Sequence, residues 1–346
     1  MTEKWVSCPV CLQQIDWRDP PLYRLDAETG EHVELTIPLN AGPERKARLR
    51  RTARIRCPSP EPTEHHLPAA YGEFGPPVVL GFVGARGSGK THLLAAMVRA
   101  IERGDLSRHH GLSCWPLDIL LHQQYLRDQV DPLFAEARRL SPTPADQMMF
   151  ADAFVVARNG GTPRPVALFD IAGDALTRVA DAAAFIDATN GLVFVADPTR
   201  LDGSEHREPA FGAVLDLLRA SGRLPEVSAA IVLTKADRLR FEEPLALWLR
   251  RDTHVLTADE SLRESADVYA YLHQRGAHAW TRPYRECARA TLHLATATGA
   301  NPLPNARTEG GDFDLGVHPS RVLRPLVALL AMTGVLDSPE AARIGT

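Results

Sequence analysis

Short apolar runs alternate with longer amphipathic segments from Pro77 onward. The runs cover residues 77–83, 165–170, 191–197, 229–234 and 290–296. Most are continuously apolar, which is typical of strands that are covered on both faces. Between them, apolar residues recur at helical spacing in His92–Arg103, Ala175–Thr189, Pro209–Ser221 and Asp259–Arg275. The pattern predicts an α/β fold with a doubly wound, mostly parallel sheet.

One stretch departs from this alternation. Ala153–Asp170 holds two apolar runs separated by Asn159-Gly160-Gly161, which predicts a tight turn and one antiparallel hairpin at the sheet edge. Arg321–Leu336 is also apolar, but it is short for a membrane span and contains a proline. We therefore expect a final helix that packs on the sheet, and no membrane attachment.

The first 75 residues or so have a different character. They carry Cys8, Cys11 and Cys57, a basic stretch from Arg45 to Arg56, and a Pro/His-rich segment that is typical of a linker. A chain of 346 residues has room for one large core and a smaller module. We expect a module and linker over residues 1–72 and a main domain over residues 77–336.

A glycine-rich loop follows the first predicted strand. Gly84 to Thr91 read G-A-R-G-S-G-K-T and fit the Walker A pattern G-x-x-x-x-G-K-[ST]. The glycines allow backbone N–H groups to turn toward a β-phosphate, and the helix N-terminus adds positive potential. Lys90 would reach the β- and γ-phosphates, and Thr91 would place a hydroxyl on Mg²⁺. The expected contacts also include Gly84, Arg86, Gly87, Ser88, Gly89 and His92.

Three later strands end in polar motifs, at the sheet edge where ligands bind in such folds. They are Asp170-Ile171-Ala172-Gly173, Thr234-Lys235-Ala236-Asp237 and Thr296-Ala297-Thr298-Gly299. Only 4 of the 39 basic residues are lysine, and two of these, Lys90 and Lys235, fall in the proposed nucleotide motifs. The order D-x-x-G, [NT]-K-x-D and an S-A-x-G-like loop after a Walker A resembles that of Ras-like P-loop GTPases.

The resemblance covers residues 77 to about 335 and implies binding of GTP or GDP with Mg²⁺. Asp237 would accept from guanine N1–H and the 2-amino group, and the stem of Lys235 would lie over the base. Adenine lacks both donors and would leave the carboxylate unpaired. Gly173, Thr234, Thr296, Ala297 and Thr298 would complete the nucleotide contacts. Asp170 and Thr143 would assist Thr91 at Mg²⁺; Thr162 is the weaker threonine candidate because it follows the hairpin turn.

The chain departs from the Ras-like pattern after D-x-x-G. Asp174 stands where the family usually has the glutamine that orients the attacking water, and a carboxylate beside an anionic γ-phosphate predicts slow intrinsic hydrolysis. Arg86 occupies a loop position where a small residue is common. It could lie against the phosphates, block a partner's arginine finger, or be solvated. We expect a GTPase of low intrinsic rate that an activating partner resets and an effector reads.

The N-terminal cysteines have zinc-ligand spacing. Cys8-Pro-Val-Cys11 fits a zinc knuckle, and Cys57 with His65 or His66 could complete a tetrahedral Cys₃His site. Unliganded thiols are the alternative. Cys114 and Cys287 lie in apolar or helical contexts and are predicted to be core residues.

Composition bears on compartment and partners. The N-terminus lacks the features of a signal peptide and no run is long enough to cross a bilayer, so a cytoplasmic protein with reduced thiols is expected. The net charge of −4 argues against a protein that binds nucleic acid with its whole surface. The arginines of Thr52–Cys57 alternate as on the wet face of a strand, and no aromatic residues are interleaved, so nucleic acid is not expected as a partner.

Architecture and motifs together favour a GTP-operated switch. The architecture is similar to a bacterial group of double-GTPase domains, the second type, some of which carry a preceding zinc module and belong to multi-component signalling or conflict systems. The alternative is a scaffold that binds nucleotide without hydrolysing it and docks through its zinc module. The presence of Asp174 favours this alternative. An ATP-dependent P-loop enzyme is a third reading, against which Lys235 and Asp237 argue.

Overall fold

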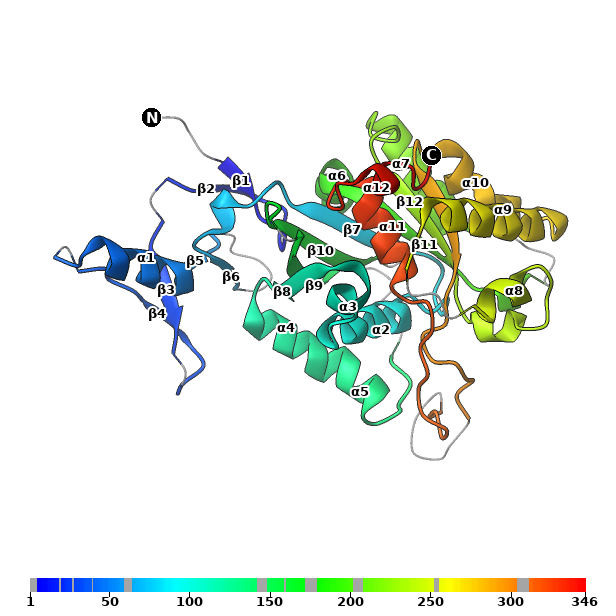
Figure 1. The fold of residues 1–346 in the computed structure, drawn as a ribbon, viewed down its shortest axis with the longest axis horizontal. Coiled ribbons are helices and arrows are strands. Elements are labelled where there is room, and N and C mark those ends of the chain that lie inside the picture. Colours follow the sequence, from blue (N-terminus) through cyan, green and yellow to red (C-terminus); the bar gives the residue numbers. More distant parts are fainter. Residues whose placement is uncertain are drawn as a thin grey trace.

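A seven-stranded sheet forms the centre of the protein in the computed structural model (Figure 1). The structure describes residues 5–346 except 19, 27, 39, 59–63, 142–147, 159, 172–178, 202–207, 252–254 and 304–310. The strand order is β13-β12-β11-β7-β10-β9-β8. The strands are β7 (Val78–Val83), β8 (Leu112–Pro116), β9 (Met148–Arg158), β10 (Arg164–Ile171), β11 (Thr189–Ala196), β12 (Ser228–Leu233) and β13 (Ala290–Leu294).

The five strands from β13 to β10 are parallel, as their apolar runs predict. Strands β9 and β10 form the predicted antiparallel hairpin. Its predicted place at the edge of the sheet is wrong, because β8 pairs antiparallel with β9 beyond it. The burial of β8 alternates, and its sequence Leu-Ser-Cys-Trp-Pro has no continuous apolar run that would mark it as a strand.

Helices cover both faces of the sheet, because strands such as β7 carry apolar side chains on both sides. All six of its residues are buried, with Val79 and Val83 packing on one face and Val78, Leu80 and Phe82 on the other. The first face is covered by α6 (Val179–Ala188), α7 (Pro209–Ala220) and α10 (His278–Glu286). The second is covered by α2 (Lys90–Glu102), α3 (Asp105–His110) and α11 (Arg324–Met332).

The predicted helices are largely confirmed. They correspond to α2, to the described part of α6, to α7, to α9 (Ala258–Gln274) and to the final helix α11. Shorter helices were not predicted: α4 (Ile119–Tyr125), the π-helix η2 (Leu126–Val130), α5 (Asp131–Phe134), α8 (Leu245–Leu249), α12 (Pro339–Ala342) and the 3-10 helices η1 (Tyr71–Glu73), η4 (Pro198–Arg200) and η5 (Ala236–Leu239). No helix in the described ranges is long and apolar enough to cross a membrane.

In its described residues, the N-terminal module contains two small antiparallel sheets and one α-helix. One sheet pairs β1 (Trp5–Ser7) with β2 (Gln14–Asp16). The other has the order β4-β3-β5-β6, from β4 (His32–Glu34), β3 (Leu22–Leu25), β5 (Arg54–Arg56) and β6 (His66–Pro68). Helix α1 (Pro43–Thr52) joins β4 to β5 and lies at the far left of Figure 1.

The module packs directly on the main sheet. Cys8, Ile15 and Leu67 belong to the same buried cluster as Ala153 of β9. The carboxylate of Asp118 accepts from the backbone N–H of His66 at 3.0 Å and also caps α4. The segment that was predicted to be a linker therefore contains a strand, β6, that anchors the module. The expected boundary, residues 72–77, begins within η1 and ends directly before β7.

Candidate functional site

The glycine-rich loop from Gly84 to Thr91, called the phosphate loop below after its predicted ligand, runs from β7 into the start of α2, as predicted. Gly87 has φ +78° and Gly89 has φ +95°, in the left-handed region that side chains disfavour. A Cβ on Gly84 would lie 2.4 Å from the carbonyl oxygen of Val195 on β11. Backbone conformation and close strand packing therefore require these glycines, and Gly89 begins a helix whose first N–H groups can bind an anion.

The functional side chains of this loop are held in defined places. Lys90 is buried, and its Nζ donates to the carbonyl oxygens of Gly84 at 2.7 Å and Ala85 at 3.2 Å. The hydroxyl of Thr91 donates to Oδ2 of Asp170 at 2.8 Å, which joins the start of α2 to β10. A hydroxyl and a carboxylate side by side are oxygen ligands of the kind that Mg²⁺ prefers, so this pair fits the predicted metal position.

The turn after β12 contacts the phosphate loop. The hydroxyl of Thr234 donates to the carbonyl oxygen of Ser88 at 2.6 Å. Lys235 is a non-glycine residue with φ +51°, and its Nζ lies 2.5 Å from Oδ2 of Asp197 and 3.2 Å from the carbonyl oxygen of Gly87. A left-handed residue at a cavity is a common feature of functional sites, where the surrounding contacts maintain it.

Asp237 is oriented by a hydroxyl from the next strand. Thr296, two residues after β13, donates to Oδ1 of Asp237 at 2.7 Å, and the N–H of Gly299 donates to the same hydroxyl at 3.0 Å. The carboxylate is thereby fixed at the wall of the cavity, where an acceptor-only group favours a ligand with adjacent donors.

These elements meet around a cavity of about 500 Å³, a size common for small-molecule sites. Its lining includes twelve residues that the sequence predicts: Arg86, Gly87, Gly89, Lys90, Thr91, His92, Thr234, Lys235, Asp237, Thr296, Ala297 and Thr298. Gly84 and Ser88 are buried in the loop and do not line it, and Asp170 bonds to the lining residue Thr91. Thr143, Gly173 and Asp174 lie outside the described residues, so their roles stay predictions.

His92 lines the cavity as a neutral side chain. Its Nε2 accepts from the N–H of Leu140 at 3.3 Å, and burial lowers its pKa to about 4. The ring packs edge-on against Phe313. His92 therefore packs in the wall of the cavity and adds no positive charge to the site at neutral pH.

Two acidic residues of the site were missed in the sequence. Asp197, at the end of β11, pairs with Lys235. Glu208, just before α7, lines the cavity at 5% exposure, and its Oε1 has no hydrogen-bond partner among the described residues. Burial raises the pKa of Glu208, while Arg200, Lys90 and the N–H of Ala85 partly oppose the rise. Of these two residues, only Asp197 could have been found in the sequence, because it directly follows an apolar run that predicts a strand.

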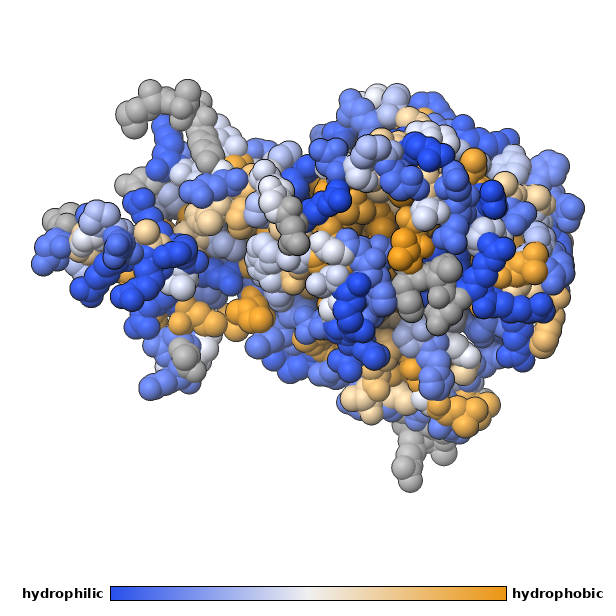
Figure 2. All heavy atoms as spheres, in the orientation of Figure 1, coloured by the Kyte–Doolittle hydropathy of each residue, from blue (hydrophilic) through white to orange (hydrophobic). Residues whose placement is uncertain are grey.

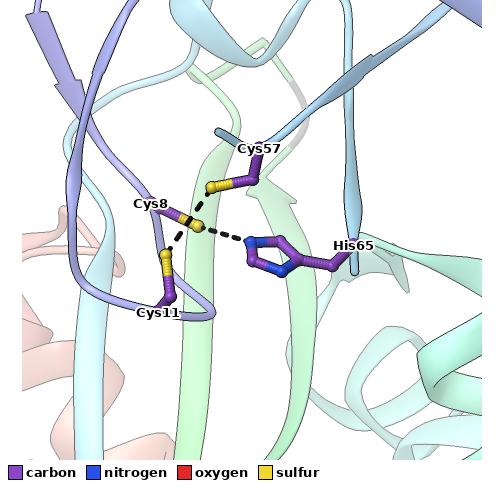
Figure 3. Close-up of side chains that lie close together, drawn as sticks. All are labelled: Cys8, Cys11, Cys57 and His65. Carbon is purple, nitrogen blue, oxygen red and sulfur yellow. Dashed lines mark hydrogen bonds between the residues drawn. The ribbon is translucent and has the colours of Figure 1, made fainter. Parts of the chain in front are cut away.

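The N-terminal cysteines converge with one histidine (Figure 3). One donor atom from each of Cys8, Cys11, Cys57 and His65 lies within 4.8 Å of the others. The sulfurs of Cys11 and Cys57 are 3.6 Å apart, and the sulfur of Cys8 is 3.1 Å from Nε2 of His65. A tetrahedral zinc with bonds of about 2.3 Å places sulfurs about 3.8 Å apart, so the cluster fits a structural zinc site.

The structure separates the two histidines, because His65 precedes β6 and belongs to the cluster, whereas His66 is the first residue of the strand. His66 lies outside the cluster, and its ring stacks on His32 with centroids 3.6 Å apart. The N–H of Val10 donates to the sulfur of Cys8 at 3.4 Å, as expected for a knuckle around a thiolate. Hydrogen bonds from Cys57 and Cys8 hold the pKa of Cys11 far below its usual value, whereas burial raises the pKa of Cys8.

The remaining cysteines lie outside this cluster. Cys287 is buried in the apolar core on one face of the sheet, and Cys114 on β8 is partly buried against the core on the other face. Both placements agree with the predicted packing roles.

Comparisons with known proteins add little to this geometry. No family model matches the chain, and no curated protein matches it. Among solved structures, it is similar to a bacterial selenocysteine-specific elongation factor, EF-Sec, at 14% identity and a TM-score of 0.27. The match covers 63% of this chain and 25% of that one, so the chain spans a quarter of the length of the elongation factor.

Proposed function

We propose that the protein binds GTP and GDP with Mg²⁺ and acts as a molecular switch. The observation that carries the proposal is the single cavity that the phosphate loop shares with Asp237. Amides of a glycine loop favour a di- or triphosphate at one wall, and an oriented carboxylate favours a base with adjacent N–H donors at another. Guanine presents such donors at N1 and the 2-amino group.

In the triphosphate state, Lys90 would reach the β- and γ-phosphates, and Thr91 with Asp170 would hold Mg²⁺. The metal would neutralise part of the phosphate charge. Thr143, Gly173 and Asp174 are proposed to respond to the γ-phosphate, and an effector reads their conformation. Asp174 in place of a water-orienting glutamine supports slow, partner-dependent hydrolysis in a cytoplasmic signalling or conflict system of bacteria.

Base choice has a sharp test in Asp237→Asn. Xanthine carries a carbonyl where guanine carries the 2-amino group, so an asparagine amide can donate to it. The asparagine Oδ1 still accepts from Thr296, which preserves the local structure. We expect affinity for GDP to fall roughly 100-fold and affinity for XDP to rise by a similar factor, measured by calorimetry. Wild-type preference for guanine retained in the variant would contradict the proposal.

The alternative function is a scaffold that binds nucleotide without turnover and docks through its zinc module. The module's packing on the same core as β9 supports it, because a docked partner could sense the nucleotide domain. Single-turnover hydrolysis of bound GTP separates the two functions. A slow but measurable rate that Lys90→Ala abolishes supports the switch, and no release of phosphate over days supports the scaffold.

A further inference from the structure

Helix α1 is an exposed helix without a core of its own. None of the residues from Pro43 to Thr52 is buried. The helix protrudes from the N-terminal module, and Figure 2 shows hydrophilic side chains gathered over that end of the molecule. Helices of globular proteins usually gain their stability by burying an apolar face. This one does not, so packing does not explain its presence.

Its charge is strongly one-sided. The ten residues hold five cations, Arg45, Lys46, Arg48, Arg50 and Arg51, and one carboxylate, Glu44. With Arg54 and Arg56, the stretch from Pro43 to Arg56 carries a net charge of +6 in a chain of net charge −4.

None of the five cations on α1 forms an ion pair in the described part of the chain, whereas Arg56 on β5 lies 3.3 Å from a carboxylate oxygen of Glu64. Some arginines elsewhere are paired: Arg219, Arg282 and Arg321 each lie 2.8 Å or less from a carboxylate oxygen. What distinguishes α1 is the density of its cations, five within ten residues with one carboxylate among them.

The spacing of these charges also works against the helix. Arg45 and Arg48, Lys46 and Arg50, and Arg48 and Arg51 are three or four residues apart, where like charges repel across a turn. Gly42, at the N-cap, provides no side-chain cap. An anion bound along the helix would relieve this repulsion and so stabilise the helix.

We propose that α1 binds the phosphate backbone of nucleic acid. The sequence argued against this partner because the arginines of Thr52–Cys57 alternate on a strand, and β5 does have that pattern. The preceding cations instead lie on a helix, where they surround the axis. A docking site for a folded protein needs a buried apolar anchor, and membrane binding needs an apolar face. The only large apolar side chain of α1 is Leu49, so neither fits.

The dimensions match a duplex. Ten helical residues span about 15 Å, and duplex DNA carries one negative charge per ~1.7 Å of axis, so about nine phosphates lie within reach of five cations. The proposal concerns backbone charge and implies little sequence preference. It is independent of the nucleotide cavity, and saturating GDP with Mg²⁺ can be present in every assay to occupy that cavity.

The test measures binding of fluorescent 20-nucleotide probes to the full-length, zinc-loaded protein between 50 and 200 mM salt. The probes are duplex DNA, duplex RNA and single-stranded DNA, with polyglutamate of matched charge as the non-nucleic polyanion. Because the cations surround the helix axis, five phosphate contacts are the upper limit, so the logarithm of the binding constant for duplex DNA should fall with the logarithm of salt at a slope no steeper than about −4.5.

A triple glutamine variant tests whether binding depends on α1. A matched control variant carries the same change in charge at other sites. The test variant replaces three exposed arginines of α1, and the control replaces three exposed arginines on α2, α9 and α10. The test substitutions are Arg45→Gln, Arg48→Gln and Arg51→Gln, and the control substitutions are Arg99→Gln, Arg263→Gln and Arg285→Gln. Because α1 buries no residue, the test variant should keep its thermal unfolding temperature.

We expect the test variant to bind duplex DNA at least about tenfold more weakly at 100 mM salt, with a slope no steeper than about −2, while the control stays near wild type. Differences among the three nucleic acid probes would identify the natural form. No binding at 50 mM salt, equal loss in both variants, or equally tight binding of polyglutamate would overturn the proposal.

Discussion

The ammonium of Lys235 lies 2.5 Å from the carboxylate of Asp197, which is 4% exposed. The pair joins the ends of β11 and β12 at the proposed base-binding wall, and it holds a lysine whose backbone is left-handed. Removing the carboxylate leaves Lys235 without this partner. Because Lys235 is about one-third exposed, water compensates part of the loss.

We therefore expect Asp197→Ala to weaken GDP binding by about tenfold, or roughly 1.4 kcal/mol. Fluorescent-nucleotide titration measures this, and Asp128→Asn, which changes an exposed carboxylate that does not line the cavity, is the control. An unchanged affinity in Asp197→Ala would show that Lys235 is positioned without the pair.

The hydroxyl of Thr296 orients Asp237, so its removal should reduce affinity and selectivity together. Thr296→Val keeps the shape and loses a hydrogen bond to a charged group, which is worth about 1.5–3 kcal/mol. We expect GDP affinity to fall roughly 10- to 100-fold and Thr296→Ser to restore most of it. Calorimetry on both variants is the measurement, and equal effects of Ser and Val would contradict the role of the hydroxyl.

Glu208 adds a buried negative charge beside the phosphate loop, and its pKa is raised chiefly by burial. Above that pKa the carboxylate repels bound phosphates, so nucleotide affinity should fall as the pH rises through it. Glu208→Gln should bind GTP about fivefold more tightly, corresponding to ~1 kcal/mol of relieved repulsion, and lose this pH dependence. Affinity measured from pH 5 to 8 tests it; tighter binding without a flatter pH profile would count against the charge effect.

The Cys₃His cluster predicts one equivalent of zinc on the purified protein. Cys57→Ser should lose the metal and lower the unfolding temperature, because Cys57 shares a buried cluster with the main sheet. Cys114→Ser, outside the metal cluster, should keep the metal. Elemental analysis and thermal unfolding are the measurements, and well under half an equivalent of zinc in wild type would remove the site.

His122 bridges two carboxylates, with Nδ1 2.6 Å from Asp152 and Nε2 2.9 Å from Glu102. Burial alone would lower the pKa of His122, but the hydrogen bond to Asp152 and the nearby charges raise it above its usual value. The folded state then retains a proton that the unfolded chain releases near pH 6.5. This stabilisation is complete below about pH 6.5 and is lost as the pH rises through the folded-state pKa.

Replacement by glutamine should therefore cost more stability at pH 6 than at pH 9. Urea unfolding of wild type and His122→Gln at both pH values measures the difference. A pH-independent cost would mean that His122 contributes through packing alone.

The phosphate loop and the strand-end motifs were predictable because each is a local sequence that follows an apolar run, and parallel strands bring their ends to one edge. Asp197 also follows an apolar run, but its pairing with Lys235 is not visible in the sequence. Glu208 carries no such signal, because its place at the cavity arises from groups distant in sequence, such as Ala85. Spacing could not separate His65 from His66, because they are adjacent in the sequence. Neighbouring side chains of an extended chain point in opposite directions, so only the structure shows which of the two faces the cysteines. The small strands β1 to β6 are too short for periodicity to show.

The central claim is that one cavity binds a guanine nucleotide through the phosphate loop and Asp237. The most direct measurement is equilibrium competition of GTP and ATP for the purified protein with Mg²⁺. The account predicts GTP binding at least roughly 100-fold tighter than ATP binding. Equal affinity for both nucleotides, or binding of neither, would contradict it.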